Sequence, residues 1–301
     1  MRTVSIAILS LSLVGITTSW VHKDIHEVIA TLTAEIAKAP TADLYYRRAT
    51  EHRAHQDTEK ALADLRQALE LAPENTTYLT ALIQLHQYKA TALPHIEKYL
   101  SIANTPAQKY EATFLLAEHQ HYQKQNREAL KHTELLQQKH PEHSTALDIL
   151  HADILKALDR PSDAANILKQ SWQRTHSIVI FNQWVDTALT AGQTTEVLPH
   201  IEHELENSRL RSSWLIRRAR ARLILDQKSQ AESDLQEALA EINKRLNPNR
   251  PDLTLIADRG LIHALLGNQE AAKTDHKLLT KSALPPKTYA LFTHTLNPPQ
   301  K

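Results

Sequence analysis

The sequence predicts an all-α protein, a solenoid of about seven helical hairpins with a capping helix at each end. Small or compact residues recur about every 34 residues, and a second series follows each of them by twelve residues. Only four of the 301 residues are glycine, which favours helices joined by short turns over a sheet protein. A period of this length indicates stacked repeats that bury their apolar faces only against their neighbours.

The two series mark where the helices of each hairpin are expected to touch. The first series is Ala49, Leu82, Ala117, Ala152, Val185, Ala219 and Gly260, and the second is Ala61, Pro94, Ala129, Ala164, Val197, Ala231 and Ala272. The clearest unit runs from Ala42 to Pro73. Both of its halves place apolar residues at spacings of three and four, as amphipathic helices do, and Pro73 closes the second helix. This unit therefore predicts a helical hairpin.

The two ends of the array predict caps. Residues 20–41 carry an amphipathic pattern that Pro40 closes, so we expect an N-terminal capping helix. Residues 285–301 are expected to form a short C-terminal capping helix and a tail, with Tyr289, Phe292 and Leu296 among its apolar residues. Between the last two units, residues 243–252 read as an insertion. Its prolines predict an extended link and a bend of the array there.

Residues 42–284 resemble the tetratricopeptide repeat family. In the first unit, Tyr45 occupies the aromatic position, Ala49, Ala61 and Ala68 the three small positions, and Pro73 the end. Units two and five depart from the pattern, with Leu82 and Pro94 and then Val185 and Val197 where alanine is expected, so these two hairpins are either distorted or not true members. The resemblance implies a right-handed superhelix whose first helices line a concave surface that holds a protein or peptide segment.

Mapping the family pattern onto this chain gives a mixed set of candidate partner-binding residues on the concave surface. They are Tyr46, Arg53, His86, Glu118, His121, Tyr122, Asp153, Lys156, Asn182, Asp186 and Arg220. The Lys and Asn clamp with which some relatives bind a C-terminal carboxylate is absent. The arginine-rich run 217–222 is either an anion site or a solvated or ion-paired helix face.

Residues 1–19 have the layout of a secretory signal peptide, with Arg2 followed by an apolar run that is short for a membrane span. Thr17 and Ser19 place small residues before a cut at Trp20. We therefore expect a periplasmic or secreted protein with no integral membrane span after cleavage. The 35 basic residues less Arg2 leave 34 against 34 acidic ones, so the mature chain lacks the positive field that nucleic acid needs.

The chain is unusually rich in histidine, with 18 histidines among its 301 residues. Cleavage before Trp20 would put His22 third from a free amine, an arrangement that binds Cu(II) or Ni(II) through four nitrogens. His22 and His26 also form one of several histidine pairs at helical contact spacing. A metal-handling protein for copper, nickel or zinc is thus the alternative function.

Enzyme chemistry has little support in the sequence. The chain has no cysteine, no glycine-rich phosphate loop and no GxSxG turn around a serine. We expect no cofactor and interpret the protein as a non-enzymatic scaffold or adaptor of the cell envelope that binds a protein or peptide. Self-association of the array is a further possibility.

Overall fold

The computed structural model describes residues 19–86, 89–142, 144–247 and 249–298, with the side chains of residues 19–25 excepted. The predicted signal peptide therefore lies almost wholly outside the described residues. All regular secondary structure in the described part is helical. The chain divides into two compact units, residues 1–141 and 142–301, and each is described by itself.

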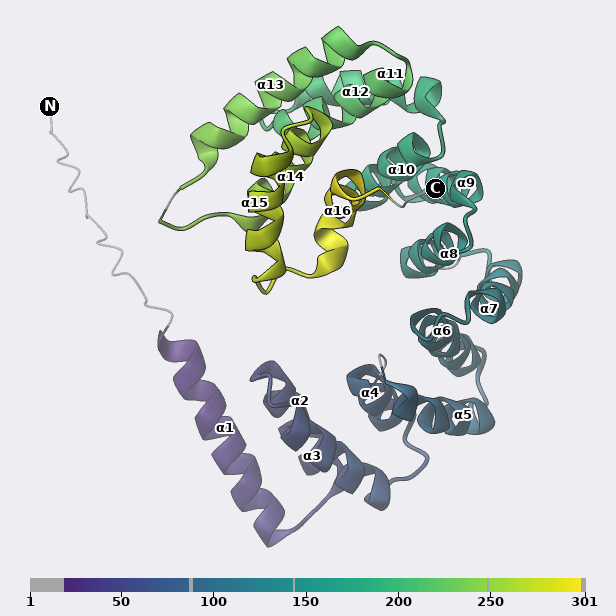
Figure 1. Ribbon diagram of the computed structural model, residues 1–301. Helices are drawn as coiled ribbons and strands as arrows, with labels where there is room; N and C mark the ends of the chain where they lie inside the picture. Colours follow the sequence, from purple (N-terminus) through teal and green to yellow (C-terminus); the bar gives the residue numbers. More distant parts are fainter. Residues whose placement is uncertain (1–18, 87–88, 143, 248, 299–301) are drawn as a thin grey trace, which may run out of the picture. The chain divides into compact units, whose positions relative to one another are not determined.

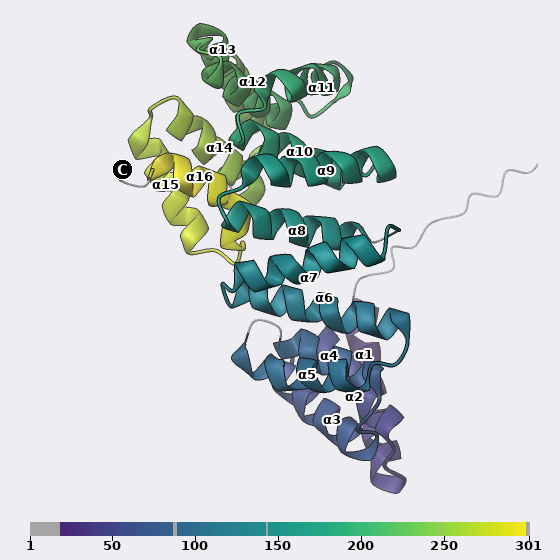
Figure 2. The ribbon, with the colours of Figure 1, turned by 90° about the vertical axis from the view of Figure 1, so that its right-hand side faces the viewer.

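The first unit holds the N-terminal cap and three hairpins (Figure 1). Its helices are α1 (Ser19–Lys38), α2 (Ala42–Ala54), α3 (Thr58–Leu71), α4 (Thr76–His86), η1 (Ala90–Ala92), α5 (Leu93–Ile102), α6 (Pro106–Tyr122) and α7 (Asn126–Lys139). Figure 2 shows α4 to α7 stacked one on the next.

The second unit holds four hairpins and the C-terminal cap. Its helices are α8 (Thr145–Ala157), α9 (Pro161–Thr175), α10 (Ile178–Thr190), α11 (Thr194–Asn207), α12 (Ser212–Ile224), α13 (Lys228–Arg245), α14 (Leu253–Leu265), α15 (Gln269–Thr280), η2 (Pro286–Tyr289) and α16 (Ala290–Leu296). The prediction of an all-α chain with seven helical hairpins and two caps is confirmed. The right-handed sense of the superhelix stays a prediction.

Thirteen of the fourteen residues of the two periodic series are buried between helices, because each lies where two helix backbones approach closely. Ala61, Ala129, Ala164, Ala231 and Ala272 have no exposed surface at all. Small side chains at these points let the helix axes come together, and larger neighbours such as Leu65 and Leu235 fill the space beside them.

The exception is Pro94, which is exposed in the first turn of α5. The expectation that it occupies a buried contact position is wrong. The connection from α4 to α5 includes the extra turn η1, so the buried place falls two residues later, on Ile96, which has no exposed surface. The constant offset of twelve residues fails here because this connection is longer than the others.

Hairpins two (α4 and α5) and five (α10 and α11) are looser than the other five. Their paired helices come within 8 Å, measured between Cα atoms, at far fewer positions than those of the other hairpins. Leucine and isoleucine, and then two valines, stand at the touching points in place of alanine, and bulkier side chains hold helix axes farther apart. Distortion, one of the two alternatives that the sequence left open, is therefore observed as a wider separation of the paired helices in hairpins two and five.

The turns inside the hairpins share a left-handed residue. Gln56, Lys124, Asp159, Gly192, Asp226 and Gly267 all have φ between 58° and 77° and lie at one equivalent place. Glycine adopts this conformation without steric cost, whereas the other residues bear some strain. The connection from α4 to α5 contains the additional 3-10 turn η1 at Ala90–Ala92.

A buried ion pair bridges the two helices in hairpins one, six and seven. In each, an arginine of the first helix donates two hydrogen bonds to an aspartate sixteen residues later: Arg48 to Asp64, Arg218 to Asp234, and Arg259 to Asp275. The aspartates are buried, so the bidentate geometry satisfies carboxylates that the core would otherwise destabilise. The hydrogen bonds to Asp234 raise the pKa of Arg218 above its ordinary value. The hydrogen bonds of Arg48 to Asp64 and of Arg259 to Asp275 raise the pKa of these two arginines in the same way.

The closing segment, residues 286–296, packs chiefly on α14, the first helix of hairpin seven, rather than on α15. Phe292 is buried against Gly260, where a Cβ atom would lie 2.4 Å from the phenyl ring. Gly260 thus makes room for the cap as well as for the hairpin contact. Within unit two, the closing segment therefore lies on the same side as the first helices α10, α12 and α14.

The insertion before hairpin seven is only partly the extended link that the sequence predicts. Residues 243–245 continue α13, whose 18 residues exceed those of the other second helices, so the expectation of a link from residue 243 is wrong. The helix continues because Ile242 is still buried in its core-facing position. The described part of the link is 246–247 and 249–252, and the predicted bend stays a prediction.

No helix among the described residues is long and apolar enough to cross a bilayer.

Candidate binding groove

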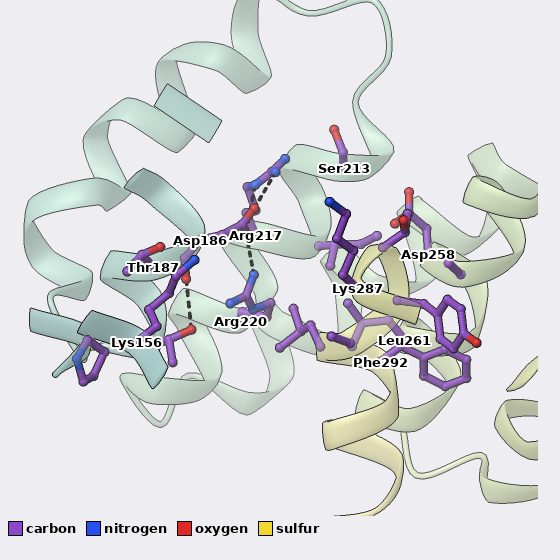
Figure 3. A pocket seen from close by; sticks show the side chains of 18 residues that line it. Lys156, Asp186, Thr187, Ser213, Arg217, Arg220, Asp258, Leu261, Lys287 and Phe292 are labelled. Carbon is purple, nitrogen blue, oxygen red and sulfur yellow. Dashed lines mark hydrogen bonds and ion pairs between the residues drawn. The ribbon is translucent and has the colours of Figure 1, made fainter. Parts of the chain in front are cut away.

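The inner side of unit two encloses a cavity of about 570 Å³ (Figure 3). Its walls come from the first helices α10, α12 and α14, with the end of α8 at one side and the closing segment at the other. A cavity of this size falls in the range of ligand pockets. We call it the inner-face pocket.

Two arginines and one aspartate form the polar centre of the inner-face pocket. Arg217 places Nη2 at 2.8 Å from one carboxylate oxygen of Asp186, and Arg220 places Nη1 at 2.7 Å from the other. Figure 3 shows both guanidinium groups converging on this carboxylate. Burial favours a higher pKa for Asp186, but the two guanidinium groups outweigh it and hold the pKa below its ordinary value. Arg217 also stacks over the ring of Trp214, 4.7 Å from its centre.

Asp258 is the second carboxylate of the inner-face pocket, and its surroundings are different. It is half-buried on α14, and within the part of the chain that the structure describes no hydrogen bond or ion pair reaches it. Burial raises the pKa of Asp258 to about 6, with Asp186 adding to the rise and Arg217 opposing it. Asp258 is therefore a partly desolvated acid without an ion-pair or hydrogen-bond partner in the described structure.

Two lysines stand at the edge of the inner-face pocket. Lys156 is bound to Asp153 one turn away on α8, at 2.6 Å. Lys287 of the closing segment is exposed and has no ion pair in the described structure. Apolar side chains complete the walls, among them Ile216, Leu261 and Phe292. The combination of an apolar wall with a few charged groups is typical of a surface that holds a polar segment of another molecule.

Unit one offers a shallower inner face. Tyr46, Arg53 and Thr50 border a space of only about 10 Å³ between α2 and α4. The ring of Tyr46 lies 4.8 Å from that of Tyr78, and the guanidinium of Arg53 reaches Gln84 at 3.5 Å. Tyr46 and Arg53 thus share one face, as the sequence predicts, without enclosing a pocket.

Two of the predicted residues do not lie open on an inner face. His86 is only 6% exposed, and its Nδ1 lies 3.1 Å from the hydroxyl of Thr91 in the turn that the longer connection adds. His86 is therefore buried in the free protein, and its part in partner binding stays a prediction. His121 contacts Asn126 at 2.8 Å across the α6 to α7 turn, so it braces that turn.

The remaining predicted residues are accessible in part. Tyr122 is exposed at the end of α6, and Glu118 one turn before it is half-buried, with a pKa raised by that burial. Asn182 is half-buried on α10. Of all the predicted residues, the structure brings Lys156, Asp186 and Arg220 together around one cavity.

The arginine run 217–222 is an ion-paired face, which settles the alternative that the sequence left open. Arg217 and Arg220 bind Asp186, while Arg218 and Arg222 both bind Asp234 on the opposite side of α12. Helical geometry sends neighbouring arginines to different faces, so the four charges do not act together.

Metal binding gains no support from side-chain geometry. No group of three or more histidine, aspartate or glutamate residues with metal-binding geometry exists among the described residues. The ring of His26 lies 4.7 Å from that of His55, which makes a ring contact and not a ligand set. The side chain of His22 lies outside the described residues, so the copper or nickel site at the mature N-terminus stays a prediction.

Sequence reasoning missed Asp258 and Lys287 as members of the inner-face pocket. Asp258 lies two residues before Gly260 of the first periodic series, so the repeat register alone places it beside the inner face of α14. The contribution of Lys287 had no comparable signal, because only the folded chain shows that the closing segment lies on α14.

Comparisons with known proteins agree with the helical repeat. Residues 42–75 match the model of the tetratricopeptide repeat family. A tetratricopeptide repeat protein from Parabacteroides merdae is similar in fold over 93% of this chain and 95% of its own, with a TM-score of 0.54 and 15% identity. Pseudomonas aeruginosa pilF covers 84% of this chain and 96% of its own, with a TM-score of 0.42 and 13% identity. Human IFIT1 in a dimer with m7Gppp-AAAA covers 87% and 69%, with a TM-score of 0.48 and 15% identity.

No curated protein matches the chain. The likeness to the first of these structures shows the fold, and the family match identifies one tetratricopeptide unit at residues 42–75.

Proposed function

We propose that this protein is a non-enzymatic scaffold of the cell envelope that binds a segment of another protein along the inner faces of its first helices. The observation that carries the proposal is the inner-face pocket of unit two, which combines apolar walls with the charged groups Asp186, Arg217, Arg220 and Asp258. Such a surface suits a chain that carries polar and apolar side chains in turn.

The pairing within the groove supports binding over a purely structural role. Arg217 and Arg220 are fixed by Asp186, so the polar centre is already ordered before a partner arrives. Preorganised side chains lose less conformational entropy on association, which favours affinity. The side chains of Arg217 and Arg220 are only 16% and 11% exposed, so both guanidinium groups are held in place at the wall of the inner-face pocket.

Export to the envelope is part of the same proposal and rests on the layout of residues 1–19. The neutral balance of charges in the mature chain fits a partner that is a protein and not a polyanion.

Site-specific photo-cross-linking in the native cells tests the binding face. A photoreactive amino acid at Thr190, an exposed residue of the inner-face pocket, is compared with the same amino acid at Gln236, an exposed residue of α13 that lies outside the pocket. We expect a discrete protein adduct from position 190 and none of the same mass from position 236. The same adduct from both positions, or no adduct from position 190, would contradict the proposal.

A further inference from the structure

Asp258 faces the inner-face pocket with its charge uncompensated. The carboxylate lines the cavity beside Ala257 and Leu261 of its own helix, and Figure 3 shows it on the α14 side, apart from the cluster around Asp186. Two acidic side chains line the inner-face pocket. Asp186 is ion-paired with Arg217 and Arg220, whereas Asp258 is not ion-paired in the described structure. A carboxylate that has lost water without gaining a partner is unfavourable for the free protein.

The basic side chains around Asp258 are either ion-paired with other carboxylates or exposed to solvent. Arg217 of α12 is held by Asp186, and Arg245 of α13 is held by Glu241 at 3.2 Å. Lys287 of the closing segment stands at the solvent edge. Asp252 at the start of α14 caps that helix through Thr254 and adds a negative charge. None of these groups forms an ion pair with Asp258 in the described structure, which leaves its oxygens free to accept hydrogen bonds from a ligand.

We propose that the inner-face pocket takes a basic side chain, lysine or arginine, from the bound segment, with its cationic head against Asp258 and its aliphatic stem along Leu261 and Ile216. The inference rests on the proposed function, because it names the chemistry of the segment that the groove binds. Long basic side chains bury their methylene groups on apolar walls while the charged end pairs, which matches this arrangement of wall and acid.

The arginines of the pocket do not prevent this binding. Two guanidinium groups share the charge of Asp186, and a charge-assisted hydrogen bond to Asp258 acts at contact distance, whereas the repulsion from Arg217 acts over a longer range. Lys287 is exposed, so salt and water screen its charge.

The test uses the full mature chain and four pools of capped nonapeptides. In each pool the central residue is fixed as lysine, arginine, norleucine or glutamate, while the other positions are mixed. Retention of each pool is compared for the wild type, for Asp258→Asn and for Asp226→Asn. Asp226 is an 83% exposed residue in the α12 to α13 turn, and its substitution removes the same charge far from the pocket lining.

We expect the lysine and arginine pools to bind the wild type and Asp226→Asn about tenfold more tightly than the norleucine pool, as one charge-assisted hydrogen bond allows. Asp258→Asn should lose this preference and still retain peptides. Equal binding of all pools, a preference for glutamate, or a lysine preference that survives Asp258→Asn would overturn the inference and leave the proposed function standing. Failure of every pool to bind the wild type would count against both.

A spectroscopic readout separates pairing from a merely structural effect. Ion pairing with a bound cation lowers the pKa of a carboxylate, so NMR titration of the Asp258 carboxyl should show a pKa near 6 in the free protein and a lower value with the lysine pool. An unchanged pKa in the presence of saturating lysine peptides would overturn the inference.

Discussion

At the scale of single residues, Asp258 has the clearest energetic consequence. Its folded-state pKa of about 6 exceeds the ordinary value of 3.8, so the ionised form is less favourable in the folded chain than in the unfolded one. Stability is therefore lost as the pH rises from about 4 to about 6, and the loss is complete above that window. At neutral pH this carboxylate opposes folding.

We predict that Asp258→Asn raises the free energy of unfolding at pH 7.5 by about 1–2 kcal/mol and leaves it unchanged near pH 4, because the neutral amide removes the cost of the buried charge. Urea denaturation at both pH values measures the difference. The matched control Asp226→Asn, which removes an exposed charge, should stay within about 0.5 kcal/mol of the wild type. A less stable Asp258→Asn at pH 7.5 would mean that the carboxylate makes a favourable contact in the free protein.

A residue that costs stability is a reasonable marker of binding. Sites that await a ligand often retain groups that would be better neutral or paired in the free protein. By contrast, the buried aspartates Asp64, Asp234 and Asp275 each hold an arginine across their hairpin, and these pairs account fully for their burial. The difference between these aspartates and Asp258 is the presence of a partner.

At the scale of helices and hairpins, the size of one side chain sets how closely two helices pack. Alanine at the contact points gives close pairs, and the looser hairpins two and five carry leucine, isoleucine or valine there. The same reasoning predicts the response to substitution.

We predict that Ala231→Leu destabilises the protein by about 1–3 kcal/mol, because Ala231 has no exposed surface and extra methyl groups must push α12 and α13 apart. Glu232→Leu is the control, since it adds the same side chain on the exposed side of the same helix. Thermal or urea unfolding of both variants measures the effect. An Ala231→Leu variant as stable as the control would contradict the packing in which Ala231 lies on the buried face of α13.

The hairpins themselves were predictable from sequence because a helix pair is a local structure that repeats. Thirteen of the fourteen residues that the period selected are buried, and Val185 and Val197 lie in a hairpin that is looser than most. Pro94 was misplaced because the extra turn η1 lengthens one connection, and a fixed offset cannot detect a longer loop.

The candidate site was less predictable because it depends on contacts between repeats. Asp186 and Arg220 were expected on one surface, but their ion pair joins residues 34 positions apart on different hairpins. Lys287 belongs to the pocket only because Phe292 docks the closing segment beside Gly260. Local periodicity does not encode where a terminal segment docks.

At the scale of the whole molecule, we propose an exported helical repeat protein whose first-helix faces bind a partner. The closing segment borders the inner-face pocket, so in unit two the cap that ends the solenoid also limits the space open to a bound chain. The exposed apolar residues Ile178, Val179 and Leu210 lie outside that pocket and carry no part of the proposed contact.

The most direct test of the central claim is the intact mass and protein content of the complex purified from the native envelope fraction. The wild type is compared with Thr190→Arg, which places a bulky side chain in the inner-face pocket, and with Gln236→Arg, which adds the same side chain outside it. We predict a mature chain that begins at Trp20, with one protein companion that stays with the wild type and Gln236→Arg and is lost from Thr190→Arg. A companion retained by Thr190→Arg, or a wild-type chain purified without any protein companion, would contradict the account.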